Sequence, residues 1–145
     1  IAGMSLSRFE RGAVVAELTE TAADVARRMR DFHVGCVVIV REARVVGIIT
    51  DRDLVVRVMA EGRDPFQTSV ADVVTYDPST LDQTDGIETA LRLMRERCVR
   101  RLPIVDRQGK VTGIVTADDL IVLLSQELAD LGTGIRENVD ANESR

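Results

Sequence analysis

The pattern of apolar and polar positions along this 145-residue chain predicts two similar units, each with five secondary-structure elements. All-apolar runs favour buried strands, and apolar residues at helical spacing favour amphipathic helices. In the first unit these signals give strand, helix, strand, strand and helix at 13–16, 22–33, 36–40, 45–49 and 54–59. A polar stretch with glycine and proline at 61–65 then interrupts the pattern.

The second unit repeats this order. Its predicted elements are a strand at 78–81, a helix that follows 85–88, a strand at 102–105, a partner strand that ends at Thr116, and a helix at 118–131. Matching positions lie 65 residues apart before the hairpin turn at 106–110 and 66 apart after it, because that turn holds one residue more than its counterpart. An insertion confined to a turn, with the strands kept in phase, indicates a genuine structural repeat.

We therefore predict an α+β protein in which two β-α-β-β-α repeats pack sheet to sheet with pseudo-twofold symmetry. A repeat of about 60 residues buries too little surface to be comfortably stable alone, and packing the two together solves this problem. The expected domains are 9–66 and 70–131, followed by a polar and mobile tail at 132–145.

The junction between the last strand and the last helix carries the same residues in both units. It reads Gly47-Ile-Ile-Thr-Asp-Arg-Asp-Leu in the first unit and Gly113-Ile-Val-Thr-Ala-Asp-Asp-Leu in the second. The glycine lets another group approach the backbone closely, and the start of a helix attracts anions. A carboxylate at this place can also accept hydrogen bonds from a vicinal diol such as ribose.

The same junctions have a purely structural interpretation. A Thr followed three residues later by an acid at a helix start is a capping box, and Thr21 with Asp24 has this form. We also expect a cap at 85–88. Capping and ligand binding therefore both remain open for the Thr50–Asp53 and Thr116–Asp119 pairs.

A resemblance to a known family is carried by the two junction motifs and by the run Arg101-Leu-Pro-Ile-Val-Asp106 followed by Gly109-Lys-Val-Thr-Gly113. The chain resembles a tandem pair of CBS domains (a Bateman module) of the stand-alone bacterial type. The resemblance covers about residues 9 to 131. It implies a regulatory sensor that binds AMP, ADP, ATP or S-adenosylmethionine in the clefts between the two domains and signals to an unidentified effector protein. The nucleotide, AMP or ATP foremost, is then a regulatory ligand, and no cofactor is required.

The resemblance also implies which residues bind the ligand. They are Thr50, Arg52, Asp53, Thr75, Tyr76, Pro78, Arg100, Arg101, Thr116 and Asp119. The two Asp residues of the motif would hold ribose hydroxyls, the two motif Thr residues would lie beside the ribose or a phosphate, and the Arg pair would reach phosphates. Backbone around 13–15 would clamp the adenine at the Asp119 site, and backbone around 75–78 would do so at the Asp53 site.

The first unit departs from this pattern. Gly35 and Cys36 stand where the second unit has Arg100 and Arg101, and Arg52 compensates for the missing charges only in part. We therefore expect one site to dominate. A ligand with phosphate groups should favour whichever cleft the Arg100–Arg101 pair faces.

Composition argues against several other classes of protein. A net charge of −5 argues against DNA binding, and no apolar run approaches the roughly 18 residues of a membrane span. No signal peptide is visible, so we expect a cytoplasmic protein. Cys36 and Cys98 lack metal-ligand spacing and His33 is the single histidine, so we predict no metal site, two buried and reduced thiols, and a structural histidine. No nucleophile–base pair stands out, so we expect no enzyme activity.

The helices at 54–59 and 120–131 carry more apolar residues than one small module can bury. We therefore expect a homodimer that packs through these helices. The sequence shows no fused catalytic or DNA-binding domain, so the expected role is that of a free-standing sensor. The alternative is a ligand-independent dimerisation or interaction module, in which the repeated motifs act as helix caps alone.

Overall fold

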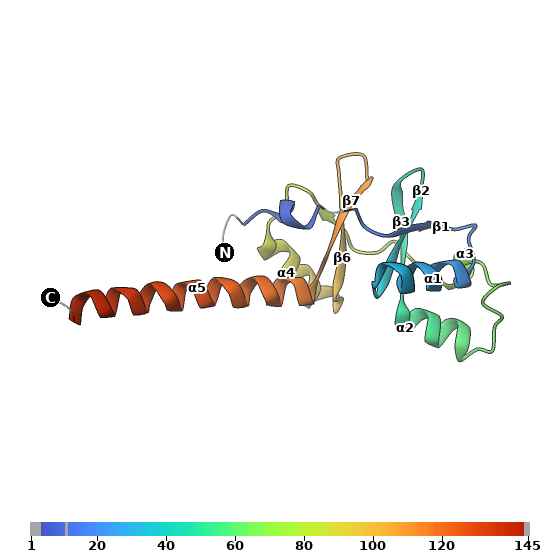
Figure 1. Cartoon of the computed structure of the whole chain (residues 1–145). Coiled ribbons are helices and arrows are strands. Elements are labelled where there is room, and N and C mark those ends of the chain that lie inside the picture. Colours follow the sequence, from blue (N-terminus) through green and yellow to red (C-terminus); the bar gives the residue numbers. More distant parts are fainter. Residues whose placement is uncertain (1–3, 11, 144–145) are drawn as a thin grey trace.

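The computed structural model describes residues 4–10 and 12–143 and contains two sheets side by side (Figure 1). The first sheet has the strand order β1 (Val15–Glu17), β2 (Cys36–Arg41), β3 (Arg44–Thr50) and β4 (Thr75–Tyr76). The second sheet has the order β5 (Leu81–Asp82), β6 (Arg101–Val105) and β7 (Val111–Thr116). The helices in chain order are η1 (Leu6–Phe9), α1 (Ala22–Phe32), α2 (Asp51–Leu54) with its π-helical continuation η2 (Val55–Met59), α3 (Val70–Val73), α4 (Ile87–Arg97) and α5 (Ala117–Glu143).

Both halves have the same internal topology. β1 pairs in parallel with β2 after the crossover helix α1, and β5 pairs in parallel with β6 after α4. β2–β3 and β6–β7 then form antiparallel hairpins, whose registers shift at Ile39/Val40 and at Ile104/Val105. The two register shifts lie at matching positions, so the two halves share this irregularity of their sheets as well. The predicted α+β fold with two β-α-β-β-α repeats is confirmed.

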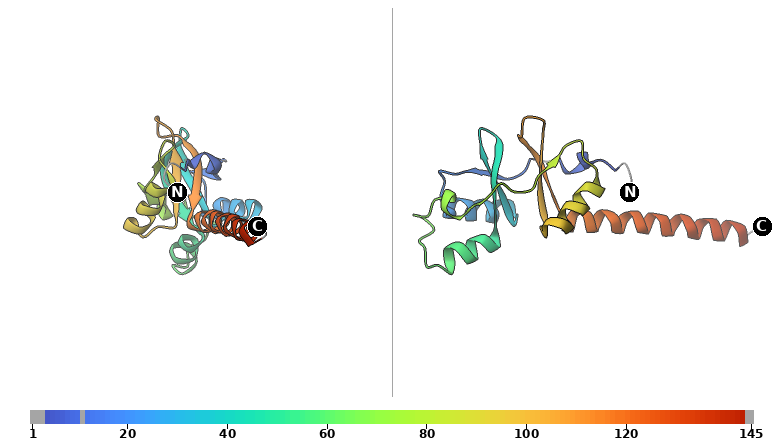
Figure 2. Two further views of the ribbon diagram at one scale, coloured as in Figure 1. Left: turned by 90° about the vertical axis from the view of Figure 1, so that its left-hand side faces the viewer. Right: turned by 180° about the vertical axis from the view of Figure 1, so that it is seen from behind.

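The two sheets meet through their hairpins, which rise next to each other in Figure 2. The amide of Val45 donates to the carbonyl of Gly109 at 3.2 Å, and the amide of Val111 donates to the carbonyl of Ala43 at 3.1 Å. Val45 and Val111 occupy equivalent positions of the two repeats. The paired hydrogen bonds therefore follow the predicted pseudo-twofold symmetry.

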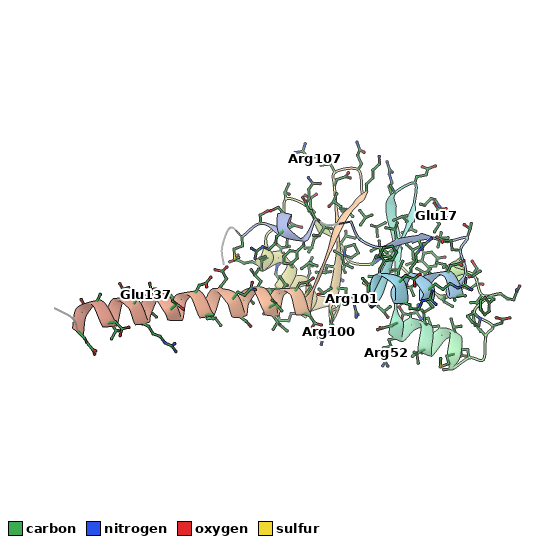
Figure 3. All side chains as sticks on the ribbon, in the orientation of Figure 1. Glu17, Arg52, Arg100, Arg101, Arg107 and Glu137 are labelled. Atoms are coloured by element: carbon green, nitrogen blue, oxygen red, sulfur yellow. The ribbon has the colours of Figure 1, made fainter. Side chains whose placement is uncertain are left out.

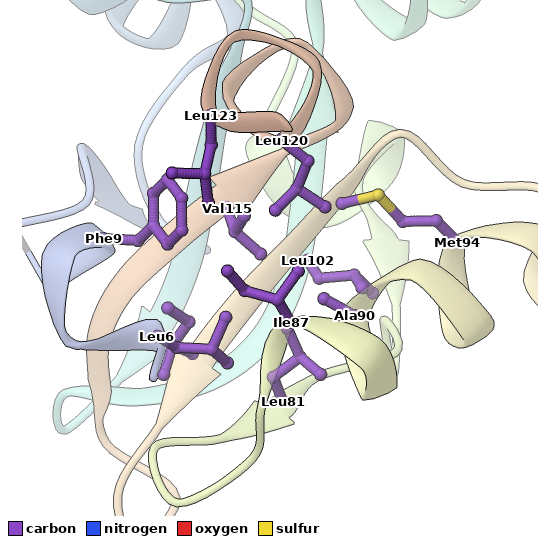
Figure 4. Packing of buried hydrophobic residues seen from close by; sticks show 11 residues of the cluster. Leu6, Phe9, Leu81, Ile87, Ala90, Met94, Leu102, Val115, Leu120 and Leu123 are labelled. Atoms are coloured by element: carbon purple, nitrogen blue, oxygen red, sulfur yellow. The ribbon is translucent and has the colours of Figure 1, made fainter. Parts of the chain in front are cut away.

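The hydrophobic core of each half is completed by a segment that precedes the other half in the sequence. Leu6 and Phe9 from η1 are buried in the core of the second half (Figure 4). Val70, Val73 and Val74, which lead into the second half, are buried in the core of the first half. β4 accordingly pairs with β3 of the first sheet. The two halves are thus joined by exchanged segments as well as by the contact between their hairpins.

This exchange was not predicted from the sequence, where both segments look like polar or weakly apolar lead-ins. The predicted domain ranges 9–66 and 70–131 follow the sequence repeat. The two cores combine residues across that division, because each lead-in crosses to the other half. That 9–66 and 70–131 are the boundaries of two separable domains stays a prediction.

Helix α5 is longer than predicted. The sequence predicts a helix end near residue 131 and a mobile tail at 132–145, but the helix continues to Glu143. Gly132 and Gly134 do not adopt the positive φ with which a glycine ends a helix, so the predicted helix end is wrong. Residues 144–145 lie outside the described part of the chain. Over the described residues, no helix is both long and apolar enough to cross a membrane.

Two of the predicted local features in the repeats differ from the structure. No side chain caps α4 at Gly86, because the Asp85 carboxylate instead accepts from the amide of Asp82 at 2.8 Å. The cap predicted at 85–88 is therefore wrong. The strands predicted at 13–16 and 78–81 begin later, at Val15 and Leu81, where pairing with the neighbouring strand begins.

Candidate functional site

Both repeated junctions are helix caps. The amide of Asp119 donates to Thr116 Oγ1 at 3.1 Å, and the amide of Thr116 donates to Asp119 Oδ2 at 3.2 Å. The matching bonds of Thr50 and Asp53 measure 3.2 and 2.8 Å. The capping interpretation is therefore confirmed in both halves. Capping does not exclude ligand binding, because a carboxylate has acceptor sites on both of its oxygens and the cap occupies only some of them.

A cavity of about 500 Å³ opens at the junction of the second half. Its lining comes from both halves: from the lead-in to β1, the turn between α1 and β2, the start of β6, and the junction between β7 and α5. The lining residues are Gly12, Ala13, Val14, His33, Val34, Gly35, Cys36, Val38, Arg100, Arg101, Ile114, Thr116, Ala117, Asp118 and Asp119. Its volume falls within the roughly 300–1,000 Å³ that is usual for small-molecule sites.

The two arginines of this cavity are placed differently. Arg100 Nη2 pairs with Asp118 Oδ1 at 3.0 Å, and both side chains are largely exposed. Arg101 reaches across to the first half, where a Cβ on Gly35 would lie 3.0 Å from Arg101 Nη2 (Figure 3). Because Gly35 has no side chain, the Arg101 guanidinium can lie close to it. The cavity carries two guanidinium groups and two carboxylates, those of Asp118 and Asp119.

The predicted residues of the other half are arranged around Asp53 and β3. Asp53 Oδ1 lies 3.7 Å from Arg57 Nη2, a cation that the sequence analysis did not single out. Thr75 and Tyr76 form β4 and pair with Ile48 and Gly47. Arg52 is exposed, as Figure 3 shows, and Pro78 is half-buried.

The structure thus brings four predicted residues, Arg100, Arg101, Thr116 and Asp119, to one cavity. The other six do not line it; they are Thr50, Arg52, Asp53, Thr75, Tyr76 and Pro78. Two of the three backbone positions expected to clamp adenine beside Asp119, Ala13 and Val14, also line the cavity. The Arg100–Arg101 pair therefore faces the Asp119 side. That this makes the Asp119 cleft the dominant site stays a prediction.

Sequence reasoning missed the part of the lining that comes from the turn between α1 and β2. His33 and Cys36 were interpreted as structural, yet both line the cavity. The pseudo-twofold relation could have indicated them, because His33 to Cys36 align with Cys98 to Arg101. Burial raises the pKa of the Cys36 thiol, and the nearby Arg101 opposes this effect.

Cys98 is exposed, so the prediction of two buried thiols is wrong for this residue. It has a left-handed backbone conformation (φ 53°) at the C-terminus of α4, where the chain leaves the helix and its packed face. In the described residues, no group of three or more His, Cys, Asp or Glu side chains is arranged to hold a metal ion.

Sequence comparison gives the family. The sequence model of the CBS domain matches this chain twice, at residues 9–60 and 70–126. The protein therefore belongs to the CBS-domain family and contains two such domains in tandem. The uncharacterised protein MK0525 of Methanopyrus kandleri is 39% identical over 112 residues, which cover 77% of this chain. The match spans a little over half of that relative, 57% of its length.

Solved structures of CBS proteins have the same fold. The CBS domain pair of protein MJ0100, in complex with 5-methylthioadenosine and S-adenosyl-L-methionine, superposes with a TM-score of 0.76 at 19% identity. The alignment covers 86% of this chain and 97% of that one. CBSX2 in complex with AMP gives a TM-score of 0.72 at 23% identity, with 86% and 98% of the chains covered. At this level of identity the two superpositions show a common fold.

Proposed function

We propose that this chain is a regulatory sensor that binds an adenosine nucleotide in the Asp119 cavity and passes the signal to a partner protein. One observation carries the proposal. A single cavity combines a carboxylate at a helix start, two guanidinium groups and exposed backbone from the opposite half. The ligands of the two structural relatives, AMP in one and S-adenosyl-L-methionine with 5-methylthioadenosine in the other, all contain adenosine and support this choice.

In this proposal each group of the cavity has one task. Asp119 accepts hydrogen bonds from the ribose hydroxyls through the acceptor sites that the cap leaves available. Thr116 lies beside the ribose or phosphate, and the positive end of the α5 helix dipole favours an anion. Arg101 supplies a guanidinium for a phosphate. The backbone of Ala13 and Val14 offers hydrogen-bonding groups to the adenine.

The charges of the cavity favour a ligand with few phosphates. Arg100 is already paired with Asp118, and Asp119 adds a further negative charge. Among the described residues, Arg101 is the guanidinium of the cavity that forms no ion pair, so AMP fits this balance better than ATP. A second nucleotide at Asp53, held with Thr50, Arg52, Thr75, Tyr76 and Pro78, is proposed as the weaker site.

Thermal unfolding with AMP, ADP, ATP or S-adenosylmethionine tests the proposal. A ligand that binds only the folded state raises its stability by about 2.7 kcal/mol at a hundredfold excess over Kd. Asp119→Asn should weaken binding roughly 10- to 100-fold, because the amide has one acceptor oxygen where the carboxylate has two, and it carries no negative charge. Asp53→Asn is the matched control and should keep most of the shift. Arg101→Gln should reduce the shift with AMP but not with adenosine.

The alternative function is a ligand-independent dimerisation or interaction module. The exposed apolar side chains of η2 support it, since Val55 is 52% and Met59 is 74% exposed. No thermal shift with any of the four ligands would favour this alternative. Recovery of chemically altered nucleotide after incubation would instead indicate an enzyme, which we do not expect.

We also propose a homodimer that packs through η2 and the first half of α5, where Ile121 and Val122 are more than half exposed. Light scattering at micromolar concentration tests it, and a mass of one chain would contradict it. The effector protein is undefined, and a cytoplasmic location stays a prediction.

A further inference from the structure

Helix α5 extends well beyond the packed part of the molecule, as both Figure 1 and Figure 2 show. Its last fully buried side chain is Leu123, and every residue from Ser125 to Glu143 except Gly132 is exposed. At 1.5 Å per residue, this stretch projects by roughly 28 Å. The extension therefore has little contact with the rest of its own chain.

One face of this projecting helix is apolar. Ile121, Leu124, Leu128, Leu131 and Ile135 follow one another at intervals of three, four, three and four residues. This is the heptad spacing of the contact positions a and d of a coiled coil. Leu128, Leu131 and Ile135 are 70%, 61% and 56% exposed. We call these five residues the α5 seam.

The positions beside the seam carry almost no charge. In the heptad these are positions e and g, and they hold Ser125, Glu127, Gly132, Gly134, Val139 and Ala141. Apart from Glu127, the acidic residues of the extension fall at b, c and f, away from the seam; they are Asp130, Glu137, Asp140 and Glu143. A second acidic copy of this chain can therefore approach the seam with little repulsion, because each extension places one acidic side chain, that of Glu127, at these flanking positions.

The composition of the extension indicates that it needs a partner. Gly132, Thr133 and Gly134 are weak helix formers in mid-helix, and Asn138 and Asn142 follow. A helix of this composition gains most of its stability from packing of its apolar face. Among the residues that the structure describes, no side chain lies near Gly132 or Gly134, since a Cβ at either would meet no atom within 4 Å. The partner that stabilises the helix must therefore come from another molecule.

We propose that the α5 seam pairs with the α5 seam of a second copy of this chain as a two-helix coiled coil. The seam can bury its apolar side chains against the seam of an identical chain, because each helix presents apolar side chains at the spacing that the other requires. This contact lies outside the nucleotide cavity. The seam shares Ile121 with the proposed contact through η2 and the first half of α5, but Leu131 and Ile135 lie beyond that contact and Met59 lies outside the seam, so the two contacts can be tested separately.

Mass by light scattering, combined with far-ultraviolet circular dichroism, tests the pairing on the full chain. The seam variant is Leu131→Lys with Ile135→Lys. The matched control is Ala129→Lys with Thr133→Lys, which adds the same two charges at the same spacing but off the seam. The seam variant should show half of the wild-type mass and a lower helical signal at 222 nm. The control should keep the wild-type mass.

Met59→Lys separates the two contacts. If the chains associate through the α5 seam, the Met59→Lys variant should keep the mass of a dimer, and adding the seam substitutions should remove it. Three results would overturn the inference: a wild-type mass of one chain, an unchanged mass in the seam variant, or an equal loss of mass in the control. Binding of AMP by the seam variant is measured in parallel, and loss of nucleotide binding alone would concern the proposed function and not the seam.

Discussion

A side chain at Gly113 would collide with the carbonyl oxygen of Phe9, because a Cβ at Gly113 would lie only 2.3 Å from that oxygen. Gly113 lies in β7 of the second sheet, whereas Phe9 ends η1, in the segment that leads into the first half. Gly47 stands in the same relationship to Val74, whose Cγ2 would lie 2.3 Å from an added Cβ. The group that approaches the glycine of each motif is thus the exchanged lead-in of the chain itself.

Gly113→Ala should therefore destabilise the fold. The atoms nearest to the added Cβ belong to the backbone of Phe9 and Glu10, which cannot rotate away as a side chain could. We expect a loss of about 1–3 kcal/mol, the usual cost of overpacking a core, measured by urea unfolding. Gly12→Ala is the control, because an added Cβ there meets nothing within 4 Å. Equal stability of the two variants would show that the lead-in moves freely.

The two halves differ in how the first helix of each begins, and this gives a second prediction. Thr21 Oγ1 accepts from the amide of Asp24 at 3.2 Å, and Asp24 Oδ2 accepts from the amide of Thr21 at 3.0 Å. Thr21→Ala should cost about 1 kcal/mol, as the loss of a cap usually does. Glu88→Ala, at the matching helix start, should change stability by less than about 0.5 kcal/mol because no side chain caps α4. A large effect of Glu88→Ala in chemical unfolding would contradict the observation that no side chain caps α4.

The cap at Thr21 also makes stability depend on pH. Hydrogen bonds from the amide and hydroxyl of Thr21 lower the pKa of Asp24 below its ordinary value of 3.8. A carboxyl with a depressed pKa in the folded state contributes stability above its unfolded pKa, and this is lost as pH falls through the folded pKa. The stability difference between wild type and Asp24→Asn should thus be constant above about pH 5 and shrink below pH 4. Urea titrations from pH 7 to pH 3 measure it, and a difference that grows in acid would refute the assignment.

The repeat, the order of elements and three of the caps could be predicted from the sequence because they depend on local pattern. Thr21 and Asp24, for example, are three residues apart and need no distant partner to form their cap. The extra residue of the second hairpin turn likewise leaves the strands on either side of it in phase with those of the first half. Features of this kind follow from spacing along the chain.

The features that sequence reasoning missed depend on contacts between distant segments. Nothing near Leu6 or Phe9 indicates which of two similar cores they complete, because that choice depends on how the halves are placed in space. Gly35 looks like a helix terminator, and only the approach of Arg101 from the other half gives it a place in the cavity. The Asp119 half of the cavity was expected from its motif, and Ala13 and Val14 of the opposite wall from the family resemblance, whereas the segment from His33 to Cys36 was not expected.

The two thiols should differ in reactivity. Cys98 is exposed, while Cys36 is buried and burial raises its pKa, so Cys36 has less thiolate at a given pH. In the folded protein at pH 8, a thiol reagent such as dithiobis(nitrobenzoate) should modify one thiol quickly and the other at least about tenfold more slowly.

Cys98→Ser should remove the fast phase, whereas Cys36→Ser should leave it in place. In denaturant both thiols of the wild type should react at similar rates, because burial no longer separates them. A fast phase of two thiols per chain in the folded state would show that the wall of the cavity beside Cys36 opens readily. Saturating nucleotide should slow the Cys36 phase alone, since this residue lines the cavity and Cys98 does not.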